Sequence, residues 1–426
     1  MMTYENALDY LKKAAERGSR PGLSRITELL GRMDNPQNKT RIIHVAGTNG
    51  KGSFGAMLTS VLKSAGYKVG GFSSPAITSV TDSFRIDCEE ISTEAFADII
   101  GDIAPVCESM DDKPTEFEIL TAAAFSMFVR NSCDVAVVEC GMGGELDSTN
   151  VIESPLLSVI TNVQLDHCSF LGSTIAEIAE HKSGIIKQGR PVFFGEISGE
   201  AYEMIRKKAE EKSAELFTAD YSDILYSWES YYGASGITFS YKGMKIELPL
   251  LGTYQYTNAV NVLNCIEILR KNGLDISYSS VCEGLSRTKW HGRFEVLRTN
   301  PYVIFDGSHN PEGIRCAADS IRRYFGDTKV ALIIGVMADK NYGLYADMLD
   351  GLIDCVFAVT PDNPRALDSS VLAEAFSHSG IPARAFKELA CGVHEAYSYA
   401  KEKNIPLIAL GSLYMYREFK EALEKQ

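Results

Sequence analysis

Lys51 and the glycines around it are the residues best placed to do chemistry. They lie in the run Gly47-Thr48-Asn49-Gly50-Lys51-Gly52-Ser53, which follows the apolar segment 42–46 and precedes a stretch with apolar residues at helical spacing. Glycines let backbone N–H groups converge on a phosphate, the start of a helix adds a favourable field, and a lysine supplies positive charge. The pattern therefore predicts a phosphate-binding loop, although Gly52 separates Lys51 from Ser53 where the common form has them adjacent.

A second group of candidates follows the apolar run 135–138. Glu139 comes directly after this run, where a carboxylate could hold Mg²⁺ beside the phosphate-binding loop. The alternative is an ordinary solvated acid at the end of a strand. Glycines at positions 141, 143 and 144 favour the first interpretation, because they allow the backbone to approach a ligand closely. Asp147 and Asn150 would give such a contact polar specificity.

A third apolar run, over 156–163, leads into Asp166 and His167. His167 could ligate a metal through its neutral imidazole, and the alternative is a packed or capping histidine. A helix predicted from Thr174 onward ends beside Lys182. Lys182 has an alternative too, as a surface lysine that the helix dipole favours at a C-terminus.

A fourth run, over 302–305, leads into Asp306 and His309. Asn310 and Pro311 then form a well-defined helix start, with an N-cap residue followed by proline at the first helical position. Ligands of doubly wound sheets bind at the carboxyl ends of strands. We therefore expect the four strand ends to serve one site, with Asp306 and His309 reaching it from a second domain.

The elements that must position these residues form an alternating series. Predicted strands in the first part of the chain are Ile42–Ala46, Val135–Glu139, Leu156–Val163 and Pro191–Gly195. Predicted strands in the second part are Tyr302–Phe305, Val330–Val336, Cys355–Val359 and Leu407–Leu410. Strands alternating with helical patterns predict mostly parallel sheets covered by helices. We expect an α/β protein with a P-loop ATPase domain over residues 1–298 and a smaller Rossmann-like domain over 299–426.

Residues 224–250 break this alternation. Gly236–Tyr241 and Met244–Leu250 flank Lys242-Gly243, which predicts a hairpin packed on the edge of the sheet.

Composition restricts the classes of partner. The 426 residues are too many for one ordinary core, and a net charge of −14 argues against a nucleic-acid surface. The ten cysteines show no metal-ligand spacing and suggest reduced thiols, with Cys140 more simply a small buried residue than a reactive one. We find no signal peptide and no apolar run near the ~20 residues that cross a bilayer. We expect a cytoplasmic protein that binds no membrane.

Six blocks of the chain, taken in order, resemble the Mur ligase superfamily, and most closely its folylpolyglutamate synthase and dihydrofolate synthase branch. They are Gly47–Ser53, Ser74-Pro75, Glu139–Asn150, Asp166-His167 with Lys182–Ile185, His291–Phe294, and Asp306–Pro311. Two further segments, Leu251–Ala259 and Gly411–Tyr414, also resemble this family, so the resemblance extends over nearly the whole chain.

The resemblance implies a role for each matching residue. It places the ATP phosphates on Lys51 and the loop amides, with Gln255, Asn258, Arg293, Asp306 and His309 also near the nucleotide. It implies that Ser74, Glu139 and His167 hold a first Mg²⁺. Lys182 matches a lysine that this superfamily carbamylates, and the resulting carboxylate would steady a second Mg²⁺.

The implied reaction is an ATP-dependent ligation. ATP would convert a substrate carboxylate into an acyl phosphate, and the amine of L-glutamate would displace phosphate to form an amide. The substrate would be folate or dihydropteroate, and the resemblance suggests a monomer. Two departures concern the acceptor rather than ATP: Glu145 stands where the family usually has arginine, and Ala76-Ile77 follows Ser74-Pro75 where His-Leu is common.

Three alternatives remain open from the sequence. A peptidoglycan-precursor ligase of the same superfamily would carry a further domain before the loop, and the 46 residues that precede Gly47 are too few for it. A related ligase with a different carboxylate acceptor is the second alternative. A non-catalytic nucleotide-binding protein is the third, although Glu139, His167 and Lys182 are all retained.

Overall fold

The computed structural model describes residues 2–227 and 236–426, which divide into two compact units. The first unit comprises Met1–Gln164, Cys168–Asp223 and Asn258–Thr288. The second comprises Leu165–His167, Ile224–Thr257 and Lys289–Gln426. The last segment of the second unit thus begins shortly before the boundary expected near residue 298.

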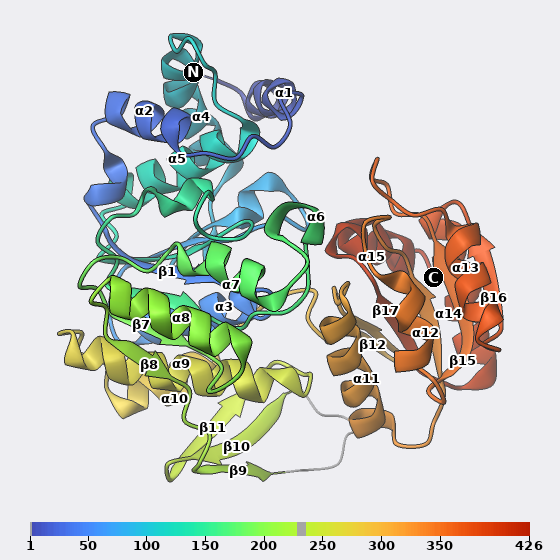
Figure 1. The fold of residues 1–426 in the computed structure, drawn as a ribbon. Helices are drawn as coiled ribbons and strands as arrows, with labels where there is room; N and C mark the ends of the chain where they lie inside the picture. The colour runs from blue at the N-terminus through green and yellow to red at the C-terminus, as the bar shows by residue number, and fades with distance from the viewer. Residues whose placement is uncertain (1, 228–235) are drawn as a thin grey trace. The chain divides into compact units, whose positions relative to one another are not determined.

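The first unit is built on an eight-stranded sheet with the order β4-β3-β2-β5-β1-β6-β7-β8. Within this order, the neighbours in the run β2-β5-β1-β6-β7-β8 pair in parallel. β3 pairs antiparallel with β2, and β4 pairs antiparallel with β3. Figure 1 labels β1, β7 and β8 of this sheet. The bounds are β1 Arg41–Ala46, β2 Val69–Phe72, β3 Phe84–Ile86, β4 Glu89–Glu90, β5 Val135–Glu139, β6 Leu157–Ile160, β7 Val192–Phe194 and β8 Leu216–Thr218. Parallel pairing of strands joined by helices confirms the predicted α/β class.

Helices cover both faces of this sheet. Their bounds are α1 Tyr4–Ala15, α2 Ser24–Arg32, α3 Lys51–Ser64, α4 Thr93–Glu108, α5 Glu116–Arg130, α6 Cys168–Leu171, α7 Ile175–Ser183, α8 Glu200–Glu211, α9 Tyr254–Lys271 and α10 Tyr278–Ser286. Short 3₁₀ turns lie at Pro36–Asn38, Val80–Ser83 and Ser148–Val151. The first turn of α9 is counted with the second unit, and the remainder with the first.

Alternation along β1 assigns its side chains to the two faces. Ile42 packs in an apolar cluster with helices α1, α2, α4 and α5, and Ala46 packs in a second cluster with α7 and α8. His44 lies between them on the same face, because alternate residues of a strand point the same way. Helix α3 covers the opposite face, where a Cβ at Gly55 would lie 3.7 Å from a methyl group of Val137.

The second unit contains a six-stranded sheet with the order β12-β13-β17-β14-β15-β16. All of its pairs are parallel except β12 with β13. The strands are β12 Glu295–Thr299, β13 Tyr302–Phe305, β14 Val330–Ile334, β15 Ile353–Val359, β16 Ala383–Phe386 and β17 Leu407–Leu410. The helices are α11 Pro311–Phe325, α12 Tyr345–Met348, α13 Ser369–His378, α14 Leu389–Lys403 and α15 Tyr416–Glu424, with 3₁₀ turns at Tyr342–Leu344 and Leu413–Met415.

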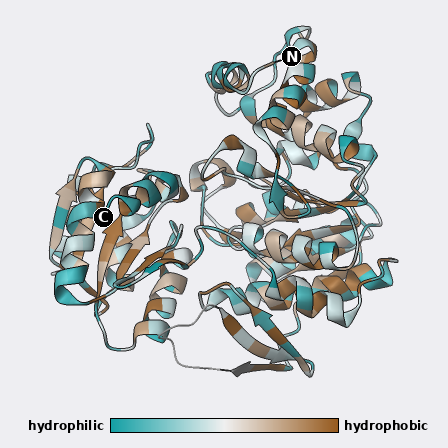
Figure 2. Ribbon diagram, turned by 180° about the vertical axis from the view of Figure 1, so that it is seen from behind, coloured by the Kyte–Doolittle hydropathy of each residue, from teal (hydrophilic) through white to brown (hydrophobic). Residues whose placement is uncertain are grey.

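The predicted strands all lie inside the two sheets, and the prediction misses the edge strands β4, β8, β12 and β16 as well as the short strands β2 and β3. Central strands such as β14 are buried along their whole length. Figure 2 shows strongly hydrophobic strands next to the C-terminal end of the chain. The edge strand β16 is partly exposed at every residue, and β12 is partly or fully exposed throughout. Edge strands therefore lack the apolar run on which the prediction depended.

The predicted hairpin is present. β10 Ile237–Tyr241 and β11 Met244–Leu248 pair antiparallel around Lys242-Gly243. With β9 Ile224–Ser227 they form a separate three-stranded sheet. Positions 228–235 of the irregular stretch lie outside the described residues.

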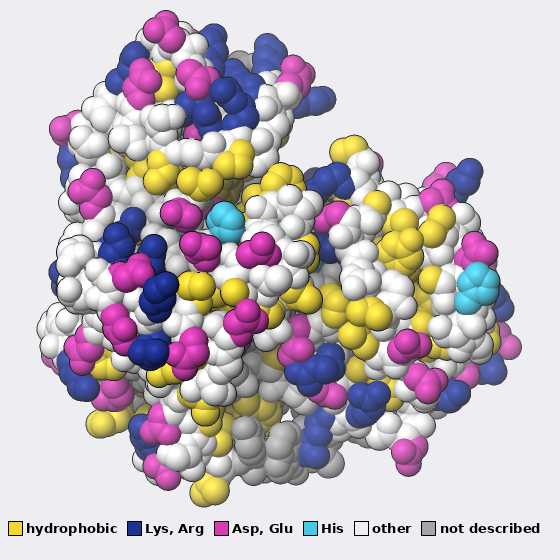
Figure 3. Space-filling view, in the orientation of Figure 1, with side chains coloured by type: hydrophobic (Ala, Val, Ile, Leu, Met, Phe, Trp, Pro, Cys, Tyr) yellow, Lys and Arg dark blue, Asp and Glu magenta, His cyan; other side chains and the backbone are white. Residues whose placement is uncertain are grey.

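Other global features agree with the composition. All ten cysteines are free thiols, and Cys140 is buried. Among the described residues, no helix is both long enough and apolar enough to cross a bilayer. Acidic and basic side chains are interspersed on the face drawn in Figure 3.

A buried ion pair ties α2 to α5. Arg25 Nε lies 3.1 Å from Glu118 Oε2, and the two side chains are 8% and 2% exposed. Glu118 also completes a capping box at the start of α5, where its carboxylate accepts hydrogen bonds from the N–H and hydroxyl of Thr115. The packing of α5 against α2 and the capping of its first turn therefore both depend on the buried carboxylate of Glu118.

Replacing Arg25 tests this pair. We expect Arg25→Ala to lower the free energy of unfolding by about 3–5 kcal/mol, because it leaves the Glu118 carboxylate buried without its positive partner. The matched control is Arg287→Ala, which removes an exposed pair with Glu283 and should cost less than about 1 kcal/mol. Urea unfolding followed by circular dichroism measures both, and equal losses would contradict the assignment.

Candidate active site

The phosphate-binding loop joins β1 to α3, as the sequence predicts. Glycine is required at two positions of this loop, because each has a positive φ and because another side chain lies where a Cβ atom would be. A Cβ at Gly47 (φ 148°) would lie 1.9 Å from Thr161 Oγ1, and one at Gly50 (φ 84°) would lie 2.5 Å from Asn258 Oδ1. Asn258 of α9 is therefore beside the loop, where the resemblance placed it.

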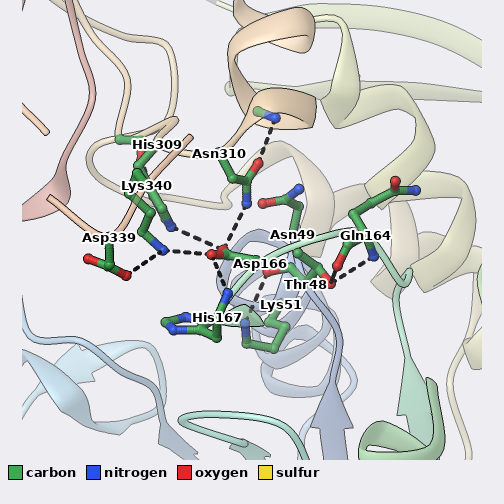
Figure 4. A network of polar contacts seen from close by, with 12 residues as sticks. Thr48, Asn49, Lys51, Gln164, Asp166, His167, His309, Asn310, Asp339 and Lys340 are labelled. Atoms are coloured by element: carbon green, nitrogen blue, oxygen red, sulfur yellow. Dashed lines mark hydrogen bonds and ion pairs between the residues drawn. The ribbon is translucent and has the colours of Figure 1, made fainter. Parts of the chain in front are cut away.

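Asn162, directly after β6, holds the first half of the loop. Its Oδ1 accepts hydrogen bonds from the N–H groups of Thr48 and Asn49, at 3.2 and 2.9 Å. Thr161 Oγ1 donates to Asn49 O at 2.7 Å, and Thr48 exchanges hydrogen bonds with the backbone of Gln164 (Figure 4). A phosphate is then expected to meet the N–H groups at the start of α3, which have no partner within the helix.

Lys51 lies over its own loop. Its Nζ donates to the carbonyl oxygens of Gly47 and Thr48, at 3.1 and 3.3 Å, and lies 3.7 Å from Glu139 Oε1. The Lys51 side chain is 17% exposed and that of Glu139 is 9% exposed. A mobile positive charge and a carboxylate thus share the carboxyl end of the sheet, which is what a nucleotide with a bound cation requires.

The neighbouring strand β2 brings further polar groups to this end. β2 pairs in parallel with β5, so Ser73 and Ser74, which follow β2, leave the sheet beside Glu139. Arg85 on β3 donates to Ser73 Oγ at 3.3 Å. Burial lowers the pKa of Arg85, while nearby carboxylates including Glu139 act to raise it. Arg85 could not be recognised from the sequence, because an isolated arginine in a short antiparallel strand matches no motif.

The glycine-rich segment after β5 lies directly on the backbone of α7. A Cβ at Gly144 would lie 2.7 Å from His181 O and 2.9 Å from Lys182 O. In turn, a Cβ at Gly184 would lie 2.4 Å from Glu145 Cα, and Glu145 N donates to His181 O at 2.7 Å. Lys182 is 3% exposed, so the alternative of a surface lysine is wrong. Gly144 and Glu145 lie against the backbone next to it.

The side chains of Asp147 and Asn150 form hydrogen bonds with the segment to which they belong. The Asp147 carboxylate accepts from Met142 N at 2.8 Å, from Thr149 N at 3.0 Å and from the Thr149 hydroxyl at 2.6 Å. Burial raises the pKa of Asp147, against the lowering effect of these hydrogen bonds. Asn150 Nδ2 donates to Glu145 O and, at 3.2 Å, to the carbonyl of Gly184.

In the second unit, Asp166 is the centre of a buried charge network (Figure 4). Its carboxylate accepts from Lys340 Nζ at 2.6 Å, from Asn310 Nδ2 at 3.0 Å and from His167 N at 2.8 Å, and His309 Nε2 lies 3.6 Å away. Burial alone would raise the pKa of Asp166, but His309 and Lys340 hold it well below its usual range. Asp166 is therefore a carboxylate.

The other candidates of the second unit lie around the loop after β13. Asp306 accepts from the Tyr254 hydroxyl at 2.7 Å and from Ser308 N at 2.8 Å. Arg293 lies against this loop, since a Cβ at Gly307 would be 2.5 Å from its guanidinium. His309 Nδ1 donates to Gly307 O at 2.8 Å. Asn310 caps α11 through Gly313 N, which confirms the predicted helix start.

The structure thus groups the predicted residues within two units. Those of the first unit are Gly47, Thr48, Asn49, Gly50, Lys51, Gly52, Ser53, Ser74, Glu139, Asp147, Asn150, Lys182 and Asn258, and those of the second are His167, Gln255, Arg293, Asp306 and His309. Sequence reasoning missed Lys340, which follows the buried strand β14. The signal was the same as for Glu139, a polar residue soon after an apolar run.

Comparisons with known proteins cover both halves of the chain. The Mur ligase middle domain matches residues 45–266, and the Mur ligase glutamate ligase domain matches residues 292–412. The chain is 33% identical to the dihydrofolate synthase/folylpolyglutamate synthase of Bacillus subtilis, over 99% of both chains. It is 32% identical to the folylpolyglutamate synthase of Lacticaseibacillus casei, again over 99% of both.

Solved structures agree with these matches. Mycobacterium tuberculosis folylpolyglutamate synthase, complexed with ADP and AMPPCP, has a TM-score of 0.89 at 27% identity over 99% of both chains. E. coli FolC in complex with DHPP and ADP has a TM-score of 0.86 at 27% identity, over 99% of this chain and 98% of that one. Together with the loop, strand-end carboxylate and buried lysine described above, these matches show that the chain belongs to the Mur ligase family, in the group of folylpolyglutamate and dihydrofolate synthases.

Proposed function

We propose that this protein is an ATP-dependent ligase that adds L-glutamate to folate, and that dihydropteroate is a possible second acceptor to be tested directly. The observation that carries the proposal is the gathering of Lys51, Glu139 and the buried Lys182 around the carboxyl end of β5. Lys51 Nζ lies 3.7 Å from Glu139 Oε1, and both lysines lie near Cys140, the residue that follows Glu139. Phosphoryl transfer needs positive charge, here from Lys51, together with metal-binding oxygens, here from Glu139.

The reaction proceeds in two steps. A carboxylate oxygen of the acceptor attacks the γ-phosphorus of ATP, the bond to the ADP oxygen breaks, and an acyl phosphate forms. The amine nitrogen of L-glutamate then attacks the acyl carbon, phosphate leaves, and the nitrogen loses a proton to give the amide. Lys51 and the N–H groups at the start of α3 stabilise the charge that develops on the phosphoryl oxygens. We assign Gln255, Asn258, Arg293, Asp306 and His309 to the nucleotide.

The residues of this chain suit Mg²⁺ bound largely through phosphate. The described residues contain no cluster of three or more His, Cys, Asp or Glu side chains that could hold a metal. Mg²⁺ is typically held by one or two carboxylates together with waters and substrate phosphates, so Glu139 with the Ser74 hydroxyl is a fitting set. We assign Ser74, Glu139 and His167 to a first Mg²⁺. When bound, Mg²⁺ would neutralise charge on the transferred phosphoryl group.

We propose that Lys182 is carbamylated and that its new carboxylate supports a second Mg²⁺. The neutral amine adds to the carbon of CO₂, a C–N bond forms, and one proton is released. The 3% exposure of Lys182 supports this assignment, because only a neutral amine reacts and burial disfavours charge. The contact of Gly144 and Glu145 with the α7 backbone encloses the lysine.

Comparing acceptors tests the function. We expect phosphate release from ATP, with Mg²⁺ and L-glutamate present, when tetrahydrofolate is supplied. Release with dihydropteroate as well would identify a bifunctional synthase that tolerates Glu145. Release with neither acceptor would overturn the folate assignment and favour a ligase with another carboxylate substrate. ATP binding without turnover on any carboxylate would favour the non-catalytic alternative.

Removing the Lys51 charge tests the phosphate-binding loop. Lys51→Met should lower kcat by about 10²–10³-fold, the usual cost of losing one group that stabilises a transition-state charge. Lys63→Met is the matched control at the other end of α3, where Lys63 is exposed and its Nζ donates to Asp87 O at 2.7 Å. A Lys51→Met enzyme with wild-type kcat would refute the role.

Labelling with ¹³CO₂ tests the carbamate. We expect a carbamate carbonyl signal in the ¹³C spectrum of the wild type and its loss in Lys182→Ala. Lys187→Ala, at a neighbouring half-buried lysine, should keep the signal. Activity of Lys182→Ala should fall by about 10²-fold or more and recover in part when a small carboxylic acid is added. Wild-type protein without the signal, or a fully active Lys182→Ala variant, would contradict the proposal.

A further inference from the structure

His44 is a fully buried polar residue in the middle of the central strand of the first sheet. Its exposure is 0%, and its neighbours along the same face, Ile42 and Ala46, belong to apolar clusters. A histidine at such a position removes apolar contact and must find polar partners to avoid a desolvation cost. Neither the sequence motifs nor the proposed mechanism explains why it is there.

The imidazole of His44 contacts the glycine-rich segment after β5. Its Nε2 lies 2.8 Å from Thr149 Oγ1 and 3.1 Å from Cys140 Sγ. Its Nδ1 has no hydrogen-bond partner among the described residues. Burial, with a smaller effect of Lys187, lowers the pKa of His44 to about 3, so the ring is neutral near pH 7.

These contacts determine which ring nitrogen carries the proton. Thr149 has one hydroxyl hydrogen, and it is directed to the Asp147 carboxylate at 2.6 Å. Thr149 Oγ1 can then only accept from His44, so Nε2 must be the protonated nitrogen. The opposite tautomer would leave a buried N–H at Nδ1 without an acceptor, which costs more than an unpaired lone pair.

The hydrogen bonds form a directed chain from the sheet to the loop. His44 Nε2–H donates to Thr149, the Thr149 hydroxyl donates to Asp147, and Asp147 accepts the N–H of Met142. Residues 142 and 149 are thereby drawn together on one carboxylate. The segment between them contains Gly144, which rests on the carbonyl groups of His181 and Lys182.

A nucleophilic role for the Cys140–His44 pair does not fit the same contacts. Cys140 is 1% exposed, and burial raises the pKa of its thiol far above the ordinary range. The thiol therefore stays protonated. His44, whose proton is on Nε2 facing sulfur and hydroxyl, presents no lone pair there to accept a proton from the thiol.

We infer that His44 is a positioning residue for the ligation, acting through Thr149 and Asp147 to fix the turn 142–149 against the backbone of Lys182. The inference rests on the proposed function, because Lys182 is assigned there to the second metal, and the sequence resemblance places Glu145 of this turn at the acceptor. It also gives Asp147 a role: its carboxylate is occupied by its own segment and shapes the acceptor contact rather than making it. The phosphate-binding loop is held separately, through the hydrogen bonds that Asn162 accepts from Thr48 and Asn49.

Two pairs of variants, one at Thr149 and one at His44, test this series of hydrogen bonds. Thr149→Val removes the hydroxyl at equal volume, and we expect kcat/KM for the folate acceptor to fall by about 10- to 100-fold, as a misplaced reacting group costs. The dissociation constant for ADP should change less than twofold. Thr149→Ser should restore most of the activity. The matched control, Thr288→Val, removes another buried hydroxyl of the first unit, which bonds Gly284 O, and should leave the acceptor constants unchanged.

The strand side is tested with His44→Gln and His44→Met. Gln can place an N–H near Thr149 and should retain more activity than Met. The double variant His44→Met/Thr149→Val should be little worse than either single one, because groups acting in one chain are not additive. Additive losses, or ADP binding that falls in parallel with kcat/KM, would show an effect on folding alone and overturn the inference.

The tautomer gives a readout that does not require activity. In ¹⁵N spectra of the wild type at pH 7, one histidine should show a protonated Nε2 and an unprotonated Nδ1, and its signals should vanish in His44→Gln. A protonated Nδ1 would overturn the inference even if the enzyme turns over folate. Conversely, failure of the wild type with folate would defeat the proposed function while leaving this spectral assignment standing.

Discussion

The candidate active site depends on backbone segments that approach more closely than a side chain permits. At Gly47, Gly50, Gly144 and Gly184, an added Cβ would lie between 1.9 and 2.7 Å from another atom of the same unit. These positions bring the loops after β1 and β5 against α7, α9 and the end of β6. Because protein interiors are close-packed and hardly compressible, the position of each of these segments determines the position of the segment that it contacts.

Buried polar side chains then select one arrangement of these loops. Asn162 fixes the start of the phosphate-binding loop, Asp147 fixes the turn after β5, and Asp166 organises the network in the second unit. Each one accepts hydrogen bonds from groups distant in sequence or from its own loop backbone. Unpaired, such groups would be costly, so the loops cannot move without losing several hydrogen bonds at once. Preorganisation of this kind is what electrostatic catalysis requires.

Local pattern was enough to predict the central strands, the phosphate-binding loop and the positions of Lys51 and Glu139. Carboxyl ends of parallel strands meet at one edge, so residues that follow apolar runs could be grouped without coordinates. The pairing of Lys340 with Asp166, and of Arg85 with Ser73, joins residues that no local pattern relates. The burial of Lys182 could not be foreseen either, because it results from tertiary contact rather than from the helix that carries it.

The second unit is assembled from three separate stretches of chain, and this affects how the protein can be divided. A fragment that begins at Lys289 would contain Lys340 and Asp306 but not Asp166 or Tyr254. Its six-stranded sheet would be complete, but Lys340 would have lost its ion pair with Asp166, and Asp306 would have lost its hydrogen bond from Tyr254. A gene cut between residues 288 and 289 would thus separate Lys340 from Asp166 and Asp306 from Tyr254. The second unit is complete only in a chain that also contains Leu165–His167 and Ile224–Thr257.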